Sequence, residues 1–227
     1  MKKAALSWSG GKDGCMALDL MVKKGVKVEC LLTTVPKELG RTFGHGEKQE
    51  LIALQGEALG IPVRFIECTF EGYTDSFIAA LKDVKKEYGL DMIAFGDLYL
   101  NGHREWGEKT ADAAGLEASY PLWMKEEEAH SALEAFAASG YKARVIRVRD
   151  EILGTEWLGR EVDDSFARDI RNTDSCPMGE AGEYHTFVCD GPLFRKKVSF
   201  DTGEIIQLET TKRLELENFA LMEKPNT

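Results

Sequence analysis

The sequence predicts an α/β protein in which a parallel sheet covered by helices is followed by a smaller α+β domain. Between Lys2 and Ala114, short runs rich in β-branched residues alternate with stretches whose apolar residues recur at helical spacing. The 227 residues are enough to bury a core in one large or two small domains. A content of 43% hydrophobic and 30% charged residues is typical of a soluble globular protein.

Strands and helices are expected to alternate in the N-terminal half. The strands are predicted at Lys2–Trp8, Val26–Val35, Val63–Glu67 and Met92–Phe95. The helices are predicted at Gly14–Lys24, Gly46–Leu59, Tyr73–Tyr88 and Gly102–Ala114. Gly25 directly follows the first helix, where a residue that accepts a left-handed conformation commonly ends it. Strands joined by helices pair in parallel and are covered on both faces.

The pattern is less regular in the C-terminal half. The elements predicted there are helices at Glu126–Ser139 and Ser165–Ile170, strands at Lys142–Val148, Tyr184–Val188 and Lys196–Phe200, and a loop at Asn172–Gly182. The letters DTGE at Asp201–Glu204 predict a hairpin turn, and the tail from Glu223 is expected to fray. We place the domain boundary within Ala118–Pro121, which gives domains at 1–119 and 120–227.

Charge and cysteine content exclude several function classes. The net charge of −10 argues against an extended nucleic-acid surface and favours a small-molecule partner. No apolar run approaches the roughly 20 residues needed to cross a bilayer, and the N-terminal AALSW is too short for a signal peptide, so we expect a cytoplasmic protein. The 5 cysteines are odd in number and lack C-x-x-C spacing, which indicates reduced thiols.

The stretch LSWSGGKDGCMAL, at Leu6–Leu18, joins the first strand to the first helix. Glycines let the backbone approach an anion, and the first amides of a helix favour phosphate. Within Ser9–Gly14, Lys12 adds a positive charge and Asp13 can hold Mg²⁺ against phosphate oxygens. The loop matches neither the Walker A pattern nor G-x-G-x-x-G.

The loop resembles the S-G-G-x-D-S pyrophosphate-binding loop of the PP-loop ATP pyrophosphatases. That resemblance implies ATP and Mg²⁺ as cofactors, with Lys12 and Asp13 as catalytic residues and Asp13 at the metal. It assigns the phosphates to Ser9, Gly10, Gly11, Lys12, Asp13 and Gly14. Gly14 departs from the pattern, because a serine there would offer a hydroxyl to a phosphate.

Three further motifs resemble the diphthine–ammonia ligase family within this group, in matching order. They are RTFGHGEKQELIALQGEALGIP (Arg41–Pro62), FGDLYLNGHREWGEKTADAAGLEASYPLW (Phe95–Trp123) and CPMGEAGEYHTFVCDGPLF (Cys176–Phe194). The resemblance implies a Rossmann-like nucleotide-binding domain of the HUP type, related to the adenine nucleotide alpha hydrolases, and a smaller substrate domain. It also implies that Gly96 and Asp97 line the nucleotide side.

The same resemblance directs Glu180, Glu183, Tyr184 and His185 to the activated substrate. The family motif E-G-G-E-[YF]-E-[TS] appears here as EAGEYHT, so His185 stands where the family has a glutamate. This form resembles a bacterial subgroup for which a link to cobalamin salvage has been suggested. From the residues themselves we add His45, in a GHG loop, and Arg104, whose guanidinium suits phosphate or carboxylate, as substrate contacts.

The predicted function is therefore that of a Mg²⁺-dependent, AMP-forming carbon–nitrogen ligase. It would adenylate a carboxylate on a small molecule or a modified protein side chain, and ammonia or another amine would displace AMP. Diphthine and a cobalamin-related acceptor both stay open, as do the nitrogen donor and the oligomeric state, a homo-oligomer included. Two alternatives are a non-catalytic ATP-binding sensor and a tRNA-modifying PP-loop enzyme. The acidic charge and the lack of paired cysteines disfavour the tRNA enzyme.

Overall fold

The computed structural model describes residues 1–224, which divide into two compact units. The first unit comprises Met1–Ser9, Asp13–Glu57 and Ile61–Trp123. The second unit comprises Gly10–Lys12, Ala58–Gly60 and the chain from Met124 onward. Two short segments from the N-terminal half thus pack with the C-terminal half, and one of them lies inside the predicted phosphate loop.

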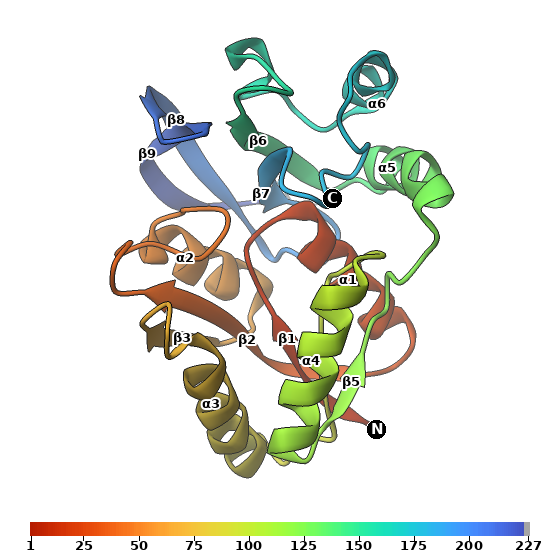
Figure 1. Ribbon diagram of the computed structural model, residues 1–227, viewed down its shortest axis with the longest axis vertical. Coiled ribbons are helices and arrows are strands. Elements are labelled where there is room, and N and C mark those ends of the chain that lie inside the picture. The colour runs from red at the N-terminus through yellow and green to blue at the C-terminus, as the bar shows by residue number, and fades with distance from the viewer. Residues whose placement is uncertain (225–227) are drawn as a thin grey trace. The chain divides into compact units, whose positions relative to one another are not determined.

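The first unit contains a five-stranded parallel sheet of order β3-β2-β1-β4-β5 (Figure 1). Its strands are β1 (Lys3–Ser7), β2 (Lys27–Pro36), β3 (Val63–Cys68), β4 (Met92–Ala94) and β5 (Glu117–Ser119). Its helices are α1 (Lys12–Lys23), α2 (Gln49–Leu59), α3 (Tyr73–Tyr88) and α4 (Asn101–Ala114). The predicted parallel α/β sheet is confirmed, and β5 is a short edge strand that the sequence pattern missed.

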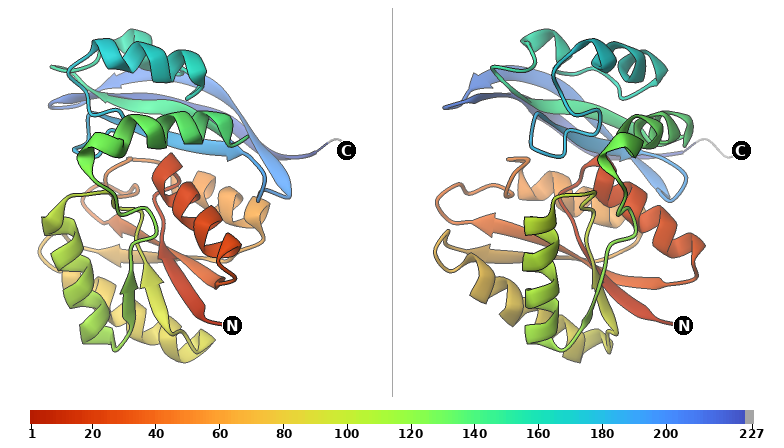
Figure 2. Two further views of the ribbon diagram at one scale, coloured as in Figure 1. Left: turned by 90° about the vertical axis from the view of Figure 1, so that its right-hand side faces the viewer. Right: turned by 45° about the vertical axis from the view of Figure 1, so that its right-hand side comes forward.

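Helices cover both faces of this sheet. Figure 2 shows α1 and α2 on one face and α3 and α4 on the other. On the α3 side, Phe77, Leu81 and Val84 are buried in one cluster with strand residues such as Ala5 and Ile93. The chain passes from β1 outward to β3 and then returns to β4 on the other side of β1, so the strand order reverses between β1 and β4. Open α/β sheets bind ligands beyond the carboxyl ends of the strands at such a reversal.

The second unit is built on a four-stranded antiparallel sheet of order β7-β6-β9-β8. Its strands are β6 (Lys142–Arg149), β7 (Tyr184–Asp190), β8 (Lys196–Gln207) and β9 (Thr211–Glu223). Its helices are α5 (Ala129–Ala138) and α6 (Asp164–Asp169), with 3-10 turns η1 (Glu126–Glu128), η2 (Thr155–Trp157) and η3 (Ile170–Asn172). This arrangement confirms the smaller α+β fold expected after the parallel sheet.

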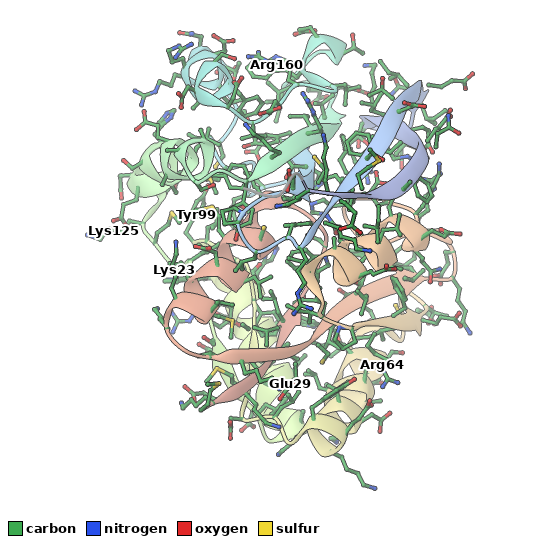
Figure 3. All side chains as sticks on the ribbon, turned by 180° about the vertical axis from the view of Figure 1, so that it is seen from behind. Lys23, Glu29, Arg64, Tyr99, Lys125 and Arg160 are labelled. Atoms are coloured by element: carbon green, nitrogen blue, oxygen red, sulfur yellow. The ribbon has the colours of Figure 1, made fainter. Side chains whose placement is uncertain are left out.

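Side-chain contacts fix the helical side of the second unit. The Asp163 carboxylate caps α6 by accepting a hydrogen bond from the Phe166 amide at 2.9 Å. Arg160, which is labelled in Figure 3, lies with its guanidinium 4.6 Å from the Trp157 ring centre and 2.6 Å from the Asp169 carboxylate. These contacts connect the η2 turn to α6 through a single arginine.

The hairpin turn predicted at Asp201–Glu204 is wrong, because these residues lie inside β8. The chain reverses at the turn between Gln207 and Thr211, where the Leu208 amide donates to the Thr211 carbonyl at 2.8 Å. The pairing register of β8 with β9 shifts in the 199–205 region, so the turn-forming residues Asp201–Glu204 lie in a bulge within a strand. Glu223 also does not fray, since it pairs with Lys196; the predicted tail beyond Lys224 lies outside the described residues.

Candidate active site

The predicted phosphate loop lies at the carboxyl end of β1. Trp8 is fixed by its amide, which donates to the Leu32 carbonyl at 2.8 Å, and by its indole, which donates to the Gln55 side chain at 3.0 Å. Gly10 has a φ of 82°, a left-handed conformation that glycine adopts without steric cost. Helix α1 begins at Lys12, two residues earlier than predicted, so Asp13 and Gly14 lie in its first turn. The first turn of a helix presents free amides and a positive dipole end to an anion.

Gly96 lies just past the end of β4, against the Asp13–Gly14 backbone. A methyl group on Gly96 would be 3.0 Å from the Gly14 amide nitrogen and 3.1 Å from the Asp13 carbonyl carbon. The absence of a side chain at this position is therefore what allows the two strand ends to approach. This approach occurs at the point where the strand order reverses, and it brings together four of the predicted residues: Asp13, Gly14, Gly96 and Asp97.

Two histidines contact this region of the first unit. The carboxylate of the partly exposed Asp97 and the Nδ1 of the exposed His103 are 2.9 Å apart. His45 Nε2 and the Ser9 hydroxyl are 3.5 Å apart. His45 is held there by a structured loop in which the Thr42 hydroxyl accepts from the Glu47 amide at 2.9 Å. The structure thus brings His45 to the predicted phosphate loop, and its contact with substrate stays a prediction.

Arg104 is engaged by neighbours in its own unit. Its Nε donates to Glu108 at 2.8 Å, one turn along α4. Its guanidinium carbon lies 4.9 Å from the Trp123 ring centre and 5.7 Å from that of Tyr120. These contacts orient a cation on the surface of the first unit, and a role in binding substrate stays a prediction.

Lys12 has an environment that its position in the motif did not suggest. Only 2% of the residue is exposed, and its Nζ donates to the Met178 carbonyl at 2.5 Å. The same ammonium lies 4.8 Å from the Tyr184 ring centre, and the Lys12 amide donates to the Thr186 hydroxyl at 3.0 Å. Lys12 therefore contacts the Cys176–Thr186 segment, with which it shares the second unit. Its neighbour Asp13 belongs to the first unit.

The predicted substrate residues lie together in the second unit, on the loop before β7 and its first residues. Glu183 is 7% exposed, and its Oε1 accepts from the Cys176 amide at 3.2 Å. Its Oε2 is buried and has no hydrogen-bond partner within the described part of the chain. The Tyr184 hydroxyl donates to the Pro177 carbonyl at 2.6 Å, which folds the loop around the ring. Glu180 lies in the same loop and is partly exposed.

His185 is neutral at physiological pH. Burial lowers its pKa to about 3, with further lowering by the cations Arg147, Lys12 and Arg149. The two arginines were missed by the sequence reasoning. Their signal was the alternation in KARVIRVR at Lys142–Arg149, where Arg147 and Arg149 share one face of a strand.

The comparison with known families decides the assignment of the chain. The family model of the diphthamide synthase N-terminal domain matches residues 1–118, and that of the diphthamide synthase C-terminal domain matches residues 128–221. This chain belongs to the diphthamide synthase family. The resemblance stated from the motifs is thereby confirmed, and with it the prediction of an enzyme.

Individual relatives agree with this assignment. The chain is 26% identical to the diphthine–ammonia ligase of Homo sapiens, over 91% of this chain and 85% of that protein. It is 25% identical to the diphthine–ammonia ligase of Schizosaccharomyces pombe, over 88% of this chain but only 36% of that longer protein. Among solved structures, a predicted subunit of tRNA methyltransferase from Methanocaldococcus jannaschii aligns with a TM-score of 0.43 at 16% identity, over 82% of this chain and 96% of that chain.

Helix length and cysteine burial bear on the remaining sequence-based predictions. No helix in residues 1–224 is both long enough and apolar enough to span a membrane. The 5 cysteines are free, and all except the partly exposed Cys176 are buried. Burial raises the pKa of the Cys30 thiol to about 12, so this thiol is unreactive at neutral pH. Four of the 5 thiols are thus buried, as is usual for cysteines that serve as small apolar core residues.

Proposed function

We propose that this member of the family is an ATP-dependent, AMP-forming ligase that joins ammonia to a substrate carboxylate. The observation that carries the proposal is the close approach of Gly96 to the first turn of α1 at the reversal of strand order. A glycine-lined helix start at this place is the local structure that holds phosphate in parallel α/β sheets. The names of the relatives supply the reaction class.

The phosphates of ATP are assigned to the loop Ser9–Gly14 and to the edge formed by Gly96 and Asp97. The loop fits this role because Gly10 adopts a left-handed conformation before the start of α1 and Gly96, without a side chain, packs against the first turn of that helix. Asp13, in the first turn of α1, is the proposed ligand of Mg²⁺. When bound, the ion would neutralise charge on the phosphate oxygens and on the departing pyrophosphate. Residues 1–119 would thus form the ATP domain, and 120–227 the acceptor domain.

The proposed reaction has two steps, and in each step one bond forms as another breaks. A carboxylate oxygen of the acceptor attacks the α-phosphorus of ATP, which forms an acyl-adenylate and releases pyrophosphate. Ammonia then attacks the acyl carbon, the bond to AMP breaks, and the nitrogen loses a proton as the amide forms. Positioning and electrostatic stabilisation of the leaving groups are the contributions that the protein makes in such a mechanism. That proton passes to water, because His185, with a pKa of about 3, is too weak a base to hold it at neutral pH.

The acceptor is proposed to contact Glu180, Glu183, Tyr184 and His185 in the second unit. Its reacting group would be a carboxylate, carried by a diphthine side chain of a protein or by a small molecule. The relatives are named for diphthine, and the histidine at position 185 marks a difference from the family motif in the segment proposed to meet the acceptor.

The test uses ATP labelled at the α-phosphate, with Mg²⁺ and ammonium, and adds either a diphthine-bearing protein or a small-molecule extract. We expect AMP that depends on one of the two acceptors, and no AMP from Asp13→Asn. Asp19→Asn is the matched control, because Asp19 lies on the same helix and pairs with Lys23 at 2.6 Å. Formation of ADP would contradict the proposed chemistry. Tight binding of ATP without turnover on any acceptor would favour the sensor instead.

A further inference from the structure

A groove of about 350 Å³ lies between β3 and α3 in the first unit. One wall is a run of consecutive strand residues, and the other is a stripe of helix residues at helical spacing, several of them small. The lining residues are Arg64, Phe65, Ile66, Glu67, Ser76, Ala79, Ala80, Asp83 and Val84. None of them is among the residues proposed for ATP or for the acceptor, so the groove has no role in the proposed reaction.

The strand wall of this groove is an open edge of the parallel sheet. β3 is the outermost strand and lies beside β2 alone (Figure 1). The Pro62 and Cys68 carbonyls accept hydrogen bonds from the β2 side, at 2.9 and 2.8 Å. Because backbone groups alternate along a strand, the amides and carbonyls of Val63, Phe65 and Glu67 point outward. Within residues 1–224 these outward groups have no hydrogen-bond partner.

β3 lacks the features that usually protect such an edge from pairing. It pairs with β2 over its whole length without a register shift, so no bulge turns the edge away. Its sequence, VRFIEC, contains neither lysine nor proline. The cation of the strand, Arg64, which Figure 3 labels, forms an ion pair with Glu87 of α3. The edge is therefore accessible to another extended chain.

Two carboxylates that line the groove have no cationic partner. Glu67 and Asp83 are exposed, and neither forms an ion pair in the described part of the chain. Ile66 belongs to the core cluster on the α3 side, so its neighbour Glu67 projects to the other face of the sheet. The exposed cations Lys82 and Lys86 are on α3 but do not line the groove. A strand added to this edge would thus meet one carboxylate on each of its faces.

We propose that the β3 edge and its groove bind an extended basic segment of a partner protein, which adds a strand to the parallel sheet. The backbone of this segment pairs with the outward groups of Val63, Phe65 and Glu67, as in other cases of strand addition. One lysine or arginine lies opposite Glu67, and a second lies on the α3 side, where the small Ala79 leaves room beside Asp83. The two basic residues are an odd number of positions apart, since neighbours in a strand point to opposite faces.

The test measures binding of a fluorescent peptide of alternating threonine and valine with two adjacent lysines at its centre. The comparison peptide has glutamates in place of the lysines. We expect the lysine peptide to bind, more weakly as salt is raised, and the glutamate peptide not to bind. Glu67→Gln and Asp83→Asn should each weaken binding about two- to fivefold, the usual effect of losing an exposed ion pair, and the double variant about tenfold. Asp75→Asn is the matched control, because Asp75 is exposed on the same helix but does not line the groove.

A second measurement reports on the backbone pairing itself. Amide hydrogen exchange, followed residue by residue by NMR, should be fast at Val63, Phe65 and Glu67 in the free protein, because their amides point outward. The lysine peptide should slow exchange at these positions. The Ile66 amide faces β2, so it should be protected with or without the peptide.

Each other outcome overturns the inference. Failure of the lysine peptide to bind, equal affinity for the two peptides, or equal weakening by Asp83→Asn and Asp75→Asn would exclude recognition of a basic segment here. Binding without slower exchange at the outward amides would place the peptide elsewhere. Self-association that protects the same amides without peptide would make a second copy of the chain the occupant. Formation of AMP has no bearing on these results, so the inference and the proposed ligase activity can fail separately.

Discussion

The close packing of Gly96, which has no side chain, against the phosphate loop gives the most specific prediction. Gly96→Ala would place a methyl group 3.0 Å from the Gly14 nitrogen and 3.1 Å from the Asp13 carbon. The optimal separation of such atoms is about 3.5–4.0 Å, so the loop or the end of β4 must move by roughly 0.5 Å. The atoms in the way are backbone and cannot rotate aside. Gly96 does not have a positive φ, so the effect comes from this contact alone.

The expected cost is about 1–3 kcal/mol of unfolding free energy, the usual range for overpacking. ATP affinity should fall as well, because the displaced atoms include the first-turn amide of Gly14. Urea unfolding and calorimetric titration with MgATP measure the two effects. Gly102→Ala is the matched control: Gly102 lies in α4 with open space around it, and alanine there should stabilise by up to about 1 kcal/mol. If Gly96→Ala binds MgATP as tightly as Gly102→Ala does, Gly96 does not shape a nucleotide site.

The remaining predictions concern Gly14, Lys12 and His185. A side chain on Gly14 would meet the Trp8 ring at an ordinary 3.4 Å, so Gly14→Ser should fold normally and hold or raise ATP turnover. Lower turnover by Gly14→Ser than by Gly14→Ala would show that a hydroxyl at this position impairs the reaction. Lys12→Met should lose about 1–3 kcal/mol of unfolding free energy, because the buried Met178 carbonyl loses its charged donor, whereas the exposed Lys23→Met should change little in the same urea titration. The folded protein holds His185 at a pKa of about 3 against an ordinary 6.5, so the unfolded chain binds the extra proton between these values. Stability should therefore fall as the pH drops from about 6.5 toward 3, and a His185→Gln protein with an unchanged pH profile would contradict this.

Local patterns predicted the parallel half well because its strands are buried and its helices are amphipathic. Tyr73–Tyr88 coincides with α3 as predicted, since apolar spacing and Gly89 at its end specify the same helix. The C-terminal sheet was predicted less completely. The prediction missed β9 and ended β8 too early. The residues Asp201–Glu204 favour a turn, and only pairing with β9 keeps them extended. Long-range pairing of this kind leaves no local signal.

In the candidate site, too, features set by the local sequence were predicted and features set by contacts between distant residues were not. The motif at Ser9–Gly14 and the end of β4 are local features, and their meeting follows from parallel topology. That Lys12 is buried against Met178 could not be read from spacing, because the partner lies far along the chain. Arg147 and Arg149 were visible as an alternation, but the position of Arg213 opposite Arg147 is set by long-range strand pairing.

The hydrogen bond from the Val188 amide to the Gly10 carbonyl, 2.9 Å long, has a consequence for solubility. β7 is an edge strand, and an open edge is a template for pairing with another chain. Gly10–Lys12 lies along this edge and occupies polar groups that another molecule could otherwise pair with. The loop that we assign to ATP thus also protects the protein from edge-to-edge aggregation. Variants that loosen it are expected to aggregate as well as to lose activity.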